Sequence, residues 1–292
     1  MITRLDERMY RSLLYVPASN ERFVAKAADR GADAIILDLE DSIPLSEKAK
    51  ARAALTEAAP QCRRNGADIL VRVNRPIRLC IRDVEAAVAA HVDVIMLAKS
   101  ESAGHIRLIV EAIEDAEAEY KPPHPVKLIA MLEDPSAVLD AREIITASDR
   151  VIAAVSGSED ISTVLESEPS PEVLRMPKQM VHMAAKAAGR FSFGMYGTVA
   201  DYSDRASIKE LIAEANRHGF DGASCIHPSV VDLLNKGFSP KPEEIAHARR
   251  VISVLEESEA KGLGAVSLDG KMIDKPVADR ARRLLAKAQR DF

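Results

Sequence analysis

The chain has 292 residues and a formal net charge of −5, with 47% hydrophobic and 29% charged residues. This balance is that of a globular protein with a substantial core, and it excludes a disordered chain. The net negative charge does not provide the basic surface that a phosphate backbone requires, so we expect no nucleic-acid partner. No apolar run approaches the ~20 residues that span a bilayer, so we also expect no membrane partner.

The N-terminus and the cysteines bear on the compartment. The first residues, MITRLDERMYRSLL, carry acids and lack the apolar core of an export signal. Cys62, Cys80 and Cys225 are scattered and odd in number, which argues against a disulfide framework or a zinc cluster. We therefore expect a cytoplasmic protein.

Short apolar runs bounded by turn residues alternate with longer segments of helical period. The runs are apolar nearly throughout, which is typical of parallel strands covered on both faces. In chain order they span residues 12–18, 34–41, 68–74, 94–100, 126–134, 151–160, 191–197 and 222–228.

Polar residues close several of these runs at intervals of about 30 residues, the length of one strand with a returning helix. They are Asp41, Arg72, Glu101, Glu133 and Asp160. Eight such units fill residues 1–237, which predicts a (β/α)₈ TIM barrel as the catalytic domain, with these side chains around one mouth. An open doubly wound sheet is the alternative, and it would spread them along one edge.

Residues 238–292 do not continue the repeat. They predict a helix with an apolar stripe from Ile245 to Leu255, then a β-hairpin around Asp269–Gly270, then a basic final helix. A barrel is complete without them. We therefore expect this helix–hairpin–helix extension to act as a lid or as an oligomerisation element.

Two of the apolar runs end on adjacent carboxylates, Glu133 with Asp134 and Glu159 with Asp160. An acid at a strand end is most often the N-cap of the next helix, and we expect that role for Asp134 and Glu159. Glu133 and Asp160 would stand on neighbouring strands. Two such carboxylates can hold a hard cation such as Mg²⁺ and leave positions for water and substrate.

The other polar residues at the strand ends have two interpretations each. Arg72 offers a planar fork of donors for a carboxylate, or it pairs structurally with Glu40 or Asp41. Glu40 and Asp41 are expected to support the site from outside rather than to bind the ion. Glu101 is either a helix cap or an outer partner of the site.

Six sequence segments carry a resemblance to a known family. In chain order they read RSLLYVPASNERFVAKAADRGADAIILDLEDSI, VRVN, AMLED, SGSEDI, GFDGASCIHPSVV and GAVSLDGKMIDKP. Together they resemble the citrate lyase β-subunit family of the HpcH/HpaI aldolase/citrate lyase superfamily, which includes malyl-CoA and citramalyl-CoA lyases. The resemblance extends from about residue 11 to residue 285.

The resemblance implies roles for the residues at the barrel mouth. Glu133 and Asp160 match the residues that bind Mg²⁺ in relatives, and Glu133 also belongs to the substrate-binding set. Arg72 matches a catalytic arginine that holds the carboxylate or carbonyl of the small acid. Tyr15 and Lys26 match positions near the CoA thioester or its phosphates.

The resemblance also implies roles near the C-terminus. Ile226 and His227 match a stretch beside the CoA arm, although His227 is equally explained as a satisfied turn histidine. Asp274 matches an aspartate that enters the active site of the next subunit and handles the proton on the acetyl carbon; alternatively, it is only a hairpin residue. A homotrimer or hexamer is implied.

The implied activity is that of a Mg²⁺-dependent carbon–carbon lyase. It would cleave an acyl-CoA thioester such as malyl-CoA or citramalyl-CoA to acetyl-CoA and a 2-keto acid, or form the thioester in the reverse direction. The 2-keto acid would be glyoxylate or pyruvate. The alternatives are the β subunit of a citrate lyase complex that gives oxaloacetate, a malyl-CoA thioesterase, and a non-catalytic protein that binds CoA esters.

Three single residues and one short segment depart from the usual family pattern. Ala18 replaces a glycine, Ser156 replaces a phenylalanine, and Lys178 stands where an arginine is frequent. The segment AKSES at residues 98–102 replaces PKVES. These departures bear on substrate identity and CoA affinity rather than on the metal pair.

Overall fold

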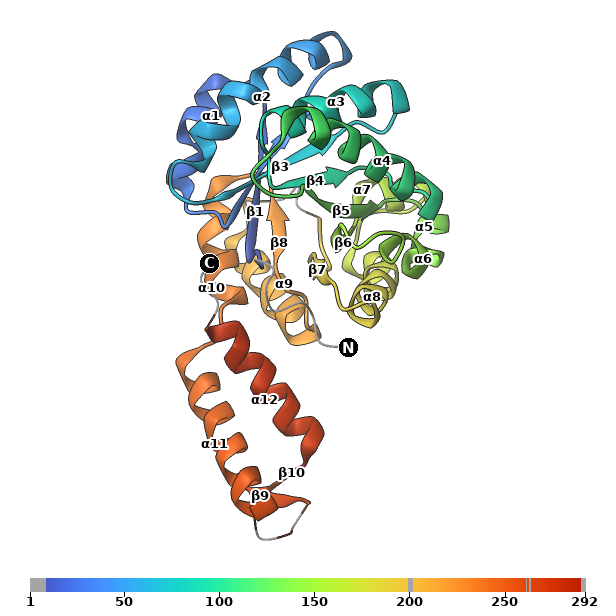
Figure 1. Ribbon diagram of the computed structural model, residues 1–292. Coiled ribbons are helices and arrows are strands. Elements are labelled where there is room, and N and C mark those ends of the chain that lie inside the picture. Colours follow the sequence, from blue (N-terminus) through green and yellow to red (C-terminus); the bar gives the residue numbers. More distant parts are fainter. Residues whose placement is uncertain (1–8, 199–201, 261, 263, 290–292) are drawn as a thin grey trace. The chain divides into compact units, whose positions relative to one another are not determined.

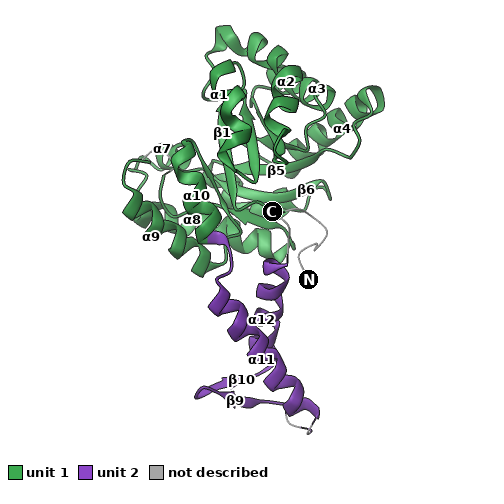
Figure 2. Ribbon diagram, turned by 90° about the vertical axis from the view of Figure 1, so that its left-hand side faces the viewer, with its two compact units in different colours: residues 1–237 green, residues 238–292 purple. Residues whose placement is uncertain are grey.

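The structure is a computed structural model that describes residues 9–198, 202–260, 262 and 264–289 (Figure 1). The chain divides into two compact units, Met1–Gly237 and Phe238–Phe292 (Figure 2). Among the described residues, none of the helices combines the length and apolar character needed to cross a membrane.

The first unit contains one parallel sheet of eight strands in the order β7-β6-β5-β4-β3-β2-β1-β8. The strands are β1 Ser12–Pro17, β2 Ala34–Asp38, β3 Asp68–Val73, β4 Val94–Leu97, β5 Lys127–Leu132, β6 Val151–Ser156, β7 Phe191–Phe193 and β8 Ala223–Cys225. Each lies within one of the predicted runs. Their side chains are buried almost throughout, which explains the apolar sequences.

The two ends of the sheet meet at β7 and β8. Phe193 and Gly222 form a parallel bridge, and the Gly194 N–H donates to the Gly222 carbonyl at 2.9 Å. A Cβ on Gly222 would lie 2.0 Å from the Tyr10 carbonyl oxygen, so only glycine allows this approach to the segment before β1. The predicted (β/α)₈ barrel is confirmed, and the open sheet is excluded.

Helices follow the strands and surround the barrel (Figure 1). In the first unit they are α1 Glu21–Ala27, α2 Lys48–Arg63, α3 Ile77–Ala89, α4 Ala103–Tyr120, α5 Pro135–Leu139, α6 Ala141–Ile145, α7 Glu159–Val164, α8 Pro171–Ala187 and α9 Arg205–His218, with α10 Val231–Phe238 at the boundary. In α4, Ile106, Ile109 and Ile113 form the buried stripe. The Ser102 side chain begins this helix by accepting the His105 N–H.

The strand register brings the C-terminal ends of the strands to one mouth. Pro17 is paired with Asp38, Asp38 with Arg72, and Leu132 with Ser156. Residues that follow these positions in the sequence therefore lie around the same opening, as expected for this fold.

The second unit consists of α11 Pro242–Ala260, an antiparallel hairpin of β9 Val266–Leu268 and β10 Lys271–Ile273, and α12 Lys275–Ala288. Asp269 and Gly270 both have positive φ, as the tight turn of a two-residue hairpin requires. Val251 and Leu255 of α11 share a small core with Ile273 and Ala278. The predicted helix–hairpin–helix arrangement is confirmed.

Candidate active site

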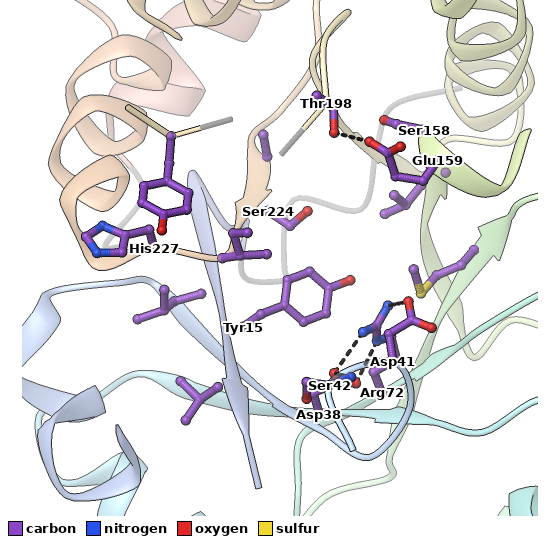
Figure 3. A pocket seen from close by; sticks show the side chains of 18 of the residues that line it. Tyr15, Asp38, Asp41, Ser42, Arg72, Ser158, Glu159, Thr198, Ser224 and His227 are labelled. Carbon is purple, nitrogen blue, oxygen red and sulfur yellow. Dashed lines mark hydrogen bonds and ion pairs between the residues drawn. The ribbon is translucent and has the colours of Figure 1, made fainter. Parts of the chain in front are cut away.

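A cavity of about 750 Å³ lies at the C-terminal ends of the barrel strands (Figure 3). Its lining includes every site residue that we predicted in the first unit: Tyr15, Lys26, Arg72, Glu133, Asp160, Ile226 and His227. Glu101 is not among the described residues that line it. Asp274 belongs to the second unit.

Glu133 and Asp160 share this cavity. Glu133 follows β5 directly and is only 7% exposed, while Asp160 is the second residue of α7, after β6. Burial, together with the negative charges of Asp160 and Glu40, raises the pKa of Glu133 to about 7. A buried carboxylate with acids as neighbours is an arrangement that a bound cation stabilises.

Lys99 contacts both members of this pair. Its backbone N–H donates to Glu133 Oε2 at 2.7 Å, and its Nζ lies 3.2 Å from Asp160 Oδ1. The residue has a φ of 48°, in the left-handed region that few lysines adopt. This conformation directs both its backbone donor and its ammonium toward the acids, a role that the sequence did not reveal.

The donor set fits a hard divalent cation. Carboxylate oxygens are the ligands that Mg²⁺ prefers, and Mg²⁺ sites in proteins use one or two carboxylates with water and substrate in the other positions. Within residues 9–198, 202–260, 262 and 264–289, no group of three or more histidine, cysteine or acidic side chains is arranged to hold a metal. A two-carboxylate site is therefore the form that these residues support.

Arg72, on β3, lines the same cavity and is held by three acids. Its Nε and Nη2 donate to the two oxygens of Asp38 at 2.7 and 2.8 Å, and its Nη1 donates to Asp41 at 3.0 Å. Glu40 Oε2 is 3.3 Å from the same Nη1. Figure 3 shows the Arg72 guanidinium with Asp38 and Asp41 at the cavity wall. The structural pairing considered for Arg72 is therefore present, and it coexists with a place in the cavity.

Asp38 is the partner that sequence reasoning missed. It is 1% exposed, and burial alone would raise its pKa, but the hydrogen bonds and charge of Arg72 lower the pKa of this carboxyl below its usual value. Asp38 also accepts the backbone N–H groups of Glu40 and Ser42. Asp38 therefore holds the plane of the Arg72 guanidinium, and the two backbone N–H groups hold Asp38 in place.

Tyr15 lies beneath Arg72, whose guanidinium carbon is 4.7 Å from the centre of the phenol ring. This distance is that of a cation–π contact. Burial raises the pKa of the Tyr15 phenol above its ordinary value, so the hydroxyl remains protonated. Tyr15 can therefore donate a hydrogen bond into the cavity (Figure 3).

His227 and Ile226 form a second part of the wall, after β8. The His227 ring stacks on Tyr202 with ring centres 4.5 Å apart and an interplanar angle of 4°. His227 Nδ1 lies 2.7 Å from the Ser229 hydroxyl, so the satisfied-turn interpretation holds for that nitrogen. Ile226 is 44% exposed in this apolar surface, and Lys26 lines the cavity from α1.

The expected helix caps were only partly correct. Asp134 caps α5 by accepting the Ser136 N–H at 2.8 Å, so this prediction is confirmed. The prediction for Glu159 is wrong, because Ser158 holds the N-cap position of α7 and the Glu159 carboxylate accepts the Thr198 hydroxyl. Glu101 caps no helix either: Ser102 precedes α4, and Glu101 forms an exposed ion pair with Arg75.

Gly157 packs against the Glu133 side chain. A Cβ at this position would lie 2.8 Å from Glu133 Cγ and 3.3 Å from Oε1. We expect Gly157→Ala to displace Glu133 and to lower the free energy of unfolding by about 1–3 kcal/mol, as overpacking of a buried site does. Urea denaturation measures this loss.

Gly104→Ala is the matched control for that substitution. Gly104 lies in the first turn of α4, and the nearest atom to a Cβ there is Ser102 Oγ at 3.7 Å, an ordinary contact. Alanine should be neutral or stabilise this helix by up to about 1 kcal/mol. Equal stability of the two variants would show that Gly157 does not constrain Glu133.

Comparison with known proteins gives the family. The family model for HpcH/HpaI aldolase/citrate lyase matches residues 11–228. The citrate lyase subunit beta of Leuconostoc mesenteroides subsp. cremoris is 34% identical over 96% of this chain and 93% of its own. A (3S)-malyl-CoA thioesterase of Cereibacter sphaeroides is 34% identical over 96% of this chain and 95% of its own.

A solved structure is similar over nearly the whole chain. The protein CitE of Mycobacterium tuberculosis, in complex with magnesium, acetoacetate and coenzyme A, superposes with a TM-score of 0.76 at 30% identity. The match covers 96% of this chain and 98% of that one. The resemblance seen in the sequence is confirmed, and the chain belongs to the HpcH/HpaI aldolase/citrate lyase family.

Proposed function

We propose that this protein is a Mg²⁺-dependent carbon–carbon lyase. Its substrate would be a 3-hydroxy-3-carboxylate acyl-CoA thioester, such as malyl-CoA or citramalyl-CoA, with acetyl-CoA and a 2-keto acid as products. The observation that carries the proposal is the pair Glu133 and Asp160 in one cavity with Arg72. A relative of the same fold was crystallised with magnesium, acetoacetate and coenzyme A, which supports this choice of ligands.

Glu133 and Asp160 would hold the ion. When bound, Mg²⁺ supplies a Lewis acid that polarises the oxygen atoms of the acid half of the substrate. Lys99 positions the two carboxylates through its N–H and its ammonium. It also balances their charge while no cation is bound.

Arg72 would bind the carboxylate of the small acid. Its two hydrogen bonds to buried Asp38 set the plane of the guanidinium. The Asp41 side chain at Nη1 is 61% exposed, so a substrate carboxylate can replace it there at little cost in desolvation. A charged, planar donor of this kind suits a carboxylate that must keep one orientation during the reaction.

The thioester arm would lie along the other wall of the cavity. Ile226 and the stacked rings of His227 and Tyr202 present an apolar and aromatic surface, and Lys26 adds a positive charge for phosphate. Tyr15, between this wall and Arg72, would donate its hydroxyl toward the reacting end. These contacts orient the carbon–carbon bond without taking part in its cleavage.

Asp274 would manage the proton on the acetyl carbon. In cleavage, the substrate hydroxyl gives its proton to solvent, the carbon–carbon bond breaks to give the keto acid, and the enolate of acetyl-CoA takes a proton from the protonated form of Asp274, which solvent then restores. In condensation the same carboxylate removes it. We propose that Asp274 enters the site of a neighbouring subunit in a homotrimer or hexamer, and that the protein works in the cytoplasm.

The relatives also favour two related functions, a carrier-dependent citrate lyase subunit and a thioesterase, and an assay must distinguish both from the proposed CoA-ester lyase. Citrate lyase β subunits and a (3S)-malyl-CoA thioesterase match the chain to a similar degree. A lyase that uses an acyl carrier would be silent on CoA esters until its carrier protein is added. A thioesterase would give malate and free CoA instead of a keto acid and acetyl-CoA.

The test is a mass-spectrometric assay of the purified chain. Malyl-CoA, citramalyl-CoA and citryl-CoA are incubated with Mg²⁺ or with EDTA. We expect acetyl-CoA and the matching keto acid to form only with Mg²⁺. Formation of free CoA and the intact hydroxy acid would identify the thioesterase. Turnover that begins only after an acyl-carrier protein is added would identify the citrate lyase β subunit, and no turnover with or without the carrier would leave the binding protein as the function.

A further inference from the structure

Lys178 is a buried charge for which the proposed mechanism gives no role. It stands on α8, is 4% exposed, and lines the cavity. Its Nζ donates to the Ser158 hydroxyl at 2.8 Å. Across the part of the chain that the structure describes, no carboxylate lies within ion-pair distance of this ammonium.

The nearest acid is committed elsewhere. Glu159 is close enough to raise the pKa of Lys178 somewhat, but its carboxylate accepts the Thr198 hydroxyl. Burial is the larger effect and lowers the pKa of Lys178 to about 8, so the side chain is still mostly protonated at pH 7.

An ammonium in this position is incomplete without an anion. It carries three N–H donors, and Ser158 accepts one of them. Buried charges in proteins are ordinarily paired, because an unpaired one costs several kcal/mol to remove from water. Since Lys178 faces the cavity and the described residues supply no carboxylate within ion-pair distance, a negatively charged group of a ligand is the partner that fits this position.

The position of Lys178 identifies which end of the ligand carries that group. Ser158 directly follows Gly157, which packs on Glu133, and it precedes Asp160 by two residues. Lys178 therefore lies on the side of the two metal-site carboxylates. The basic side chains Arg22, Lys26 and Arg30, which suit phosphate, line the cavity from the segment after β1.

We propose that Lys178 is a specificity-determining residue that binds a second carboxylate on the acid half of the substrate. This inference rests on the proposed lyase class and narrows it: among malyl-CoA, citramalyl-CoA and citryl-CoA, citryl-CoA is preferred, because its keto acid, oxaloacetate, is a dicarboxylate. The charged hydrogen bond explains why the fold retains a buried lysine for which the described residues provide no carboxylate.

The test compares ligand binding by Lys178→Met and wild type. Calorimetry with Mg²⁺ measures the Kd of oxaloacetate, pyruvate and acetyl-CoA separately, so it does not depend on turnover. We expect wild type to prefer oxaloacetate over pyruvate by about 10- to 100-fold, the contribution of a charged hydrogen bond. Lys178→Met should lose that preference and leave the Kd of pyruvate and of acetyl-CoA unchanged.

Two controls keep the result specific. Lys209→Met makes the same change of charge on the exposed face of α9 and should leave all three Kd values unchanged. Lys178→Gln keeps a polar side chain without the charge, and it should behave as Lys178→Met does. Thermal melts of each variant show whether it is folded.

The remaining outcomes decide against the inference. Equal binding of oxaloacetate and pyruvate by wild type overturns the role of Lys178 and leaves the lyase proposal standing. A weaker Kd for acetyl-CoA in Lys178→Met overturns it too, because the anion would then be a phosphate of CoA. If wild type binds neither keto acid with Mg²⁺ present, the proposed function itself fails and this inference fails with it.

Discussion

Glu133→Gln should lower Mg²⁺ affinity by more than about 100-fold, the upper end of the loss seen when only an outer partner of a metal ligand is removed. The amide has the shape of the carboxylate and can still accept the Lys99 N–H, so the fold should persist. What it lacks is the negative charge that a hard cation requires. Calorimetric titration measures the loss of Mg²⁺ affinity, and the acetyl-CoA assay measures the loss of turnover that follows from it.

Asp134→Asn is the matched control, because the same change is made one residue further along the chain. Asp134 caps α5, and asparagine caps a helix about as well as aspartate does. We expect wild-type Mg²⁺ affinity and turnover. A Glu133→Gln protein that binds Mg²⁺ as tightly as wild type would remove Glu133 from the site and with it the proposed function.

Asp274→Asn should reduce turnover by about 10²- to 10⁴-fold, roughly 3 to 5 kcal/mol of barrier, as the loss of a general acid or base does. The Asp274 carboxylate begins α12 by accepting the Val277 N–H at 3.2 Å. Asparagine preserves this cap, so stability should change little. Mg²⁺ affinity should also stay at its wild-type value, which separates this variant from Glu133→Gln.

The same variant tests whether Asp274 acts across a subunit boundary. Glu133→Gln and Asp274→Asn proteins, each inactive alone, are mixed, unfolded and refolded together. Activity should return, because an Asp274→Asn subunit can then receive the intact aspartate of a Glu133→Gln neighbour. The control is Asp269→Asn. Asp269 lies in the exposed hairpin turn and pairs with Arg250, so its substitution should leave turnover unchanged. Full activity of Asp274→Asn alone would contradict the proposed role of Asp274 in proton transfer.

The barrel, and the placement of Glu133 and Asp160 in one cavity, could be predicted because both depend on a local pattern. Parallel strands buried on two faces give apolar runs, and an acid that interrupts such a run at its end is conspicuous in the sequence. Glu133 and Asp160 were found in this way. Their shared cavity then followed from the convergence of strand ends in a barrel.

The residues that were missed depend on contacts distant in sequence. Asp38 lies at the end of β2, and its partner Arg72 is identified only by the register between β2 and β3. Lys178 was noted as a departure from the family pattern, but its place in the cavity depends on how α8 packs, which the sequence did not reveal. Lys99 acts through a left-handed backbone conformation that its sequence does not signal.

Two possible helix caps, at Glu159 and Glu101, were misplaced for a smaller reason. Ser158 precedes Glu159, and Ser102 follows Glu101, so in both cases the N-cap is one residue away from the acid that we considered. Helix ends are the least certain part of a pattern-based prediction, because adjacent serine and acidic residues compete for the same N–H groups.

The seam between β7 and β8 has a consequence for how new substrates could arise on this scaffold. Among the described residues these three-residue strands share one bridge, whereas β5 and β6 pair along their length. A wall with few hydrogen bonds deforms more readily than a fully paired one. Substitutions beside the seam can therefore reshape the cavity while Glu133 and Asp160 stay in place, so under the proposed function the specificity could diverge without loss of the chemistry.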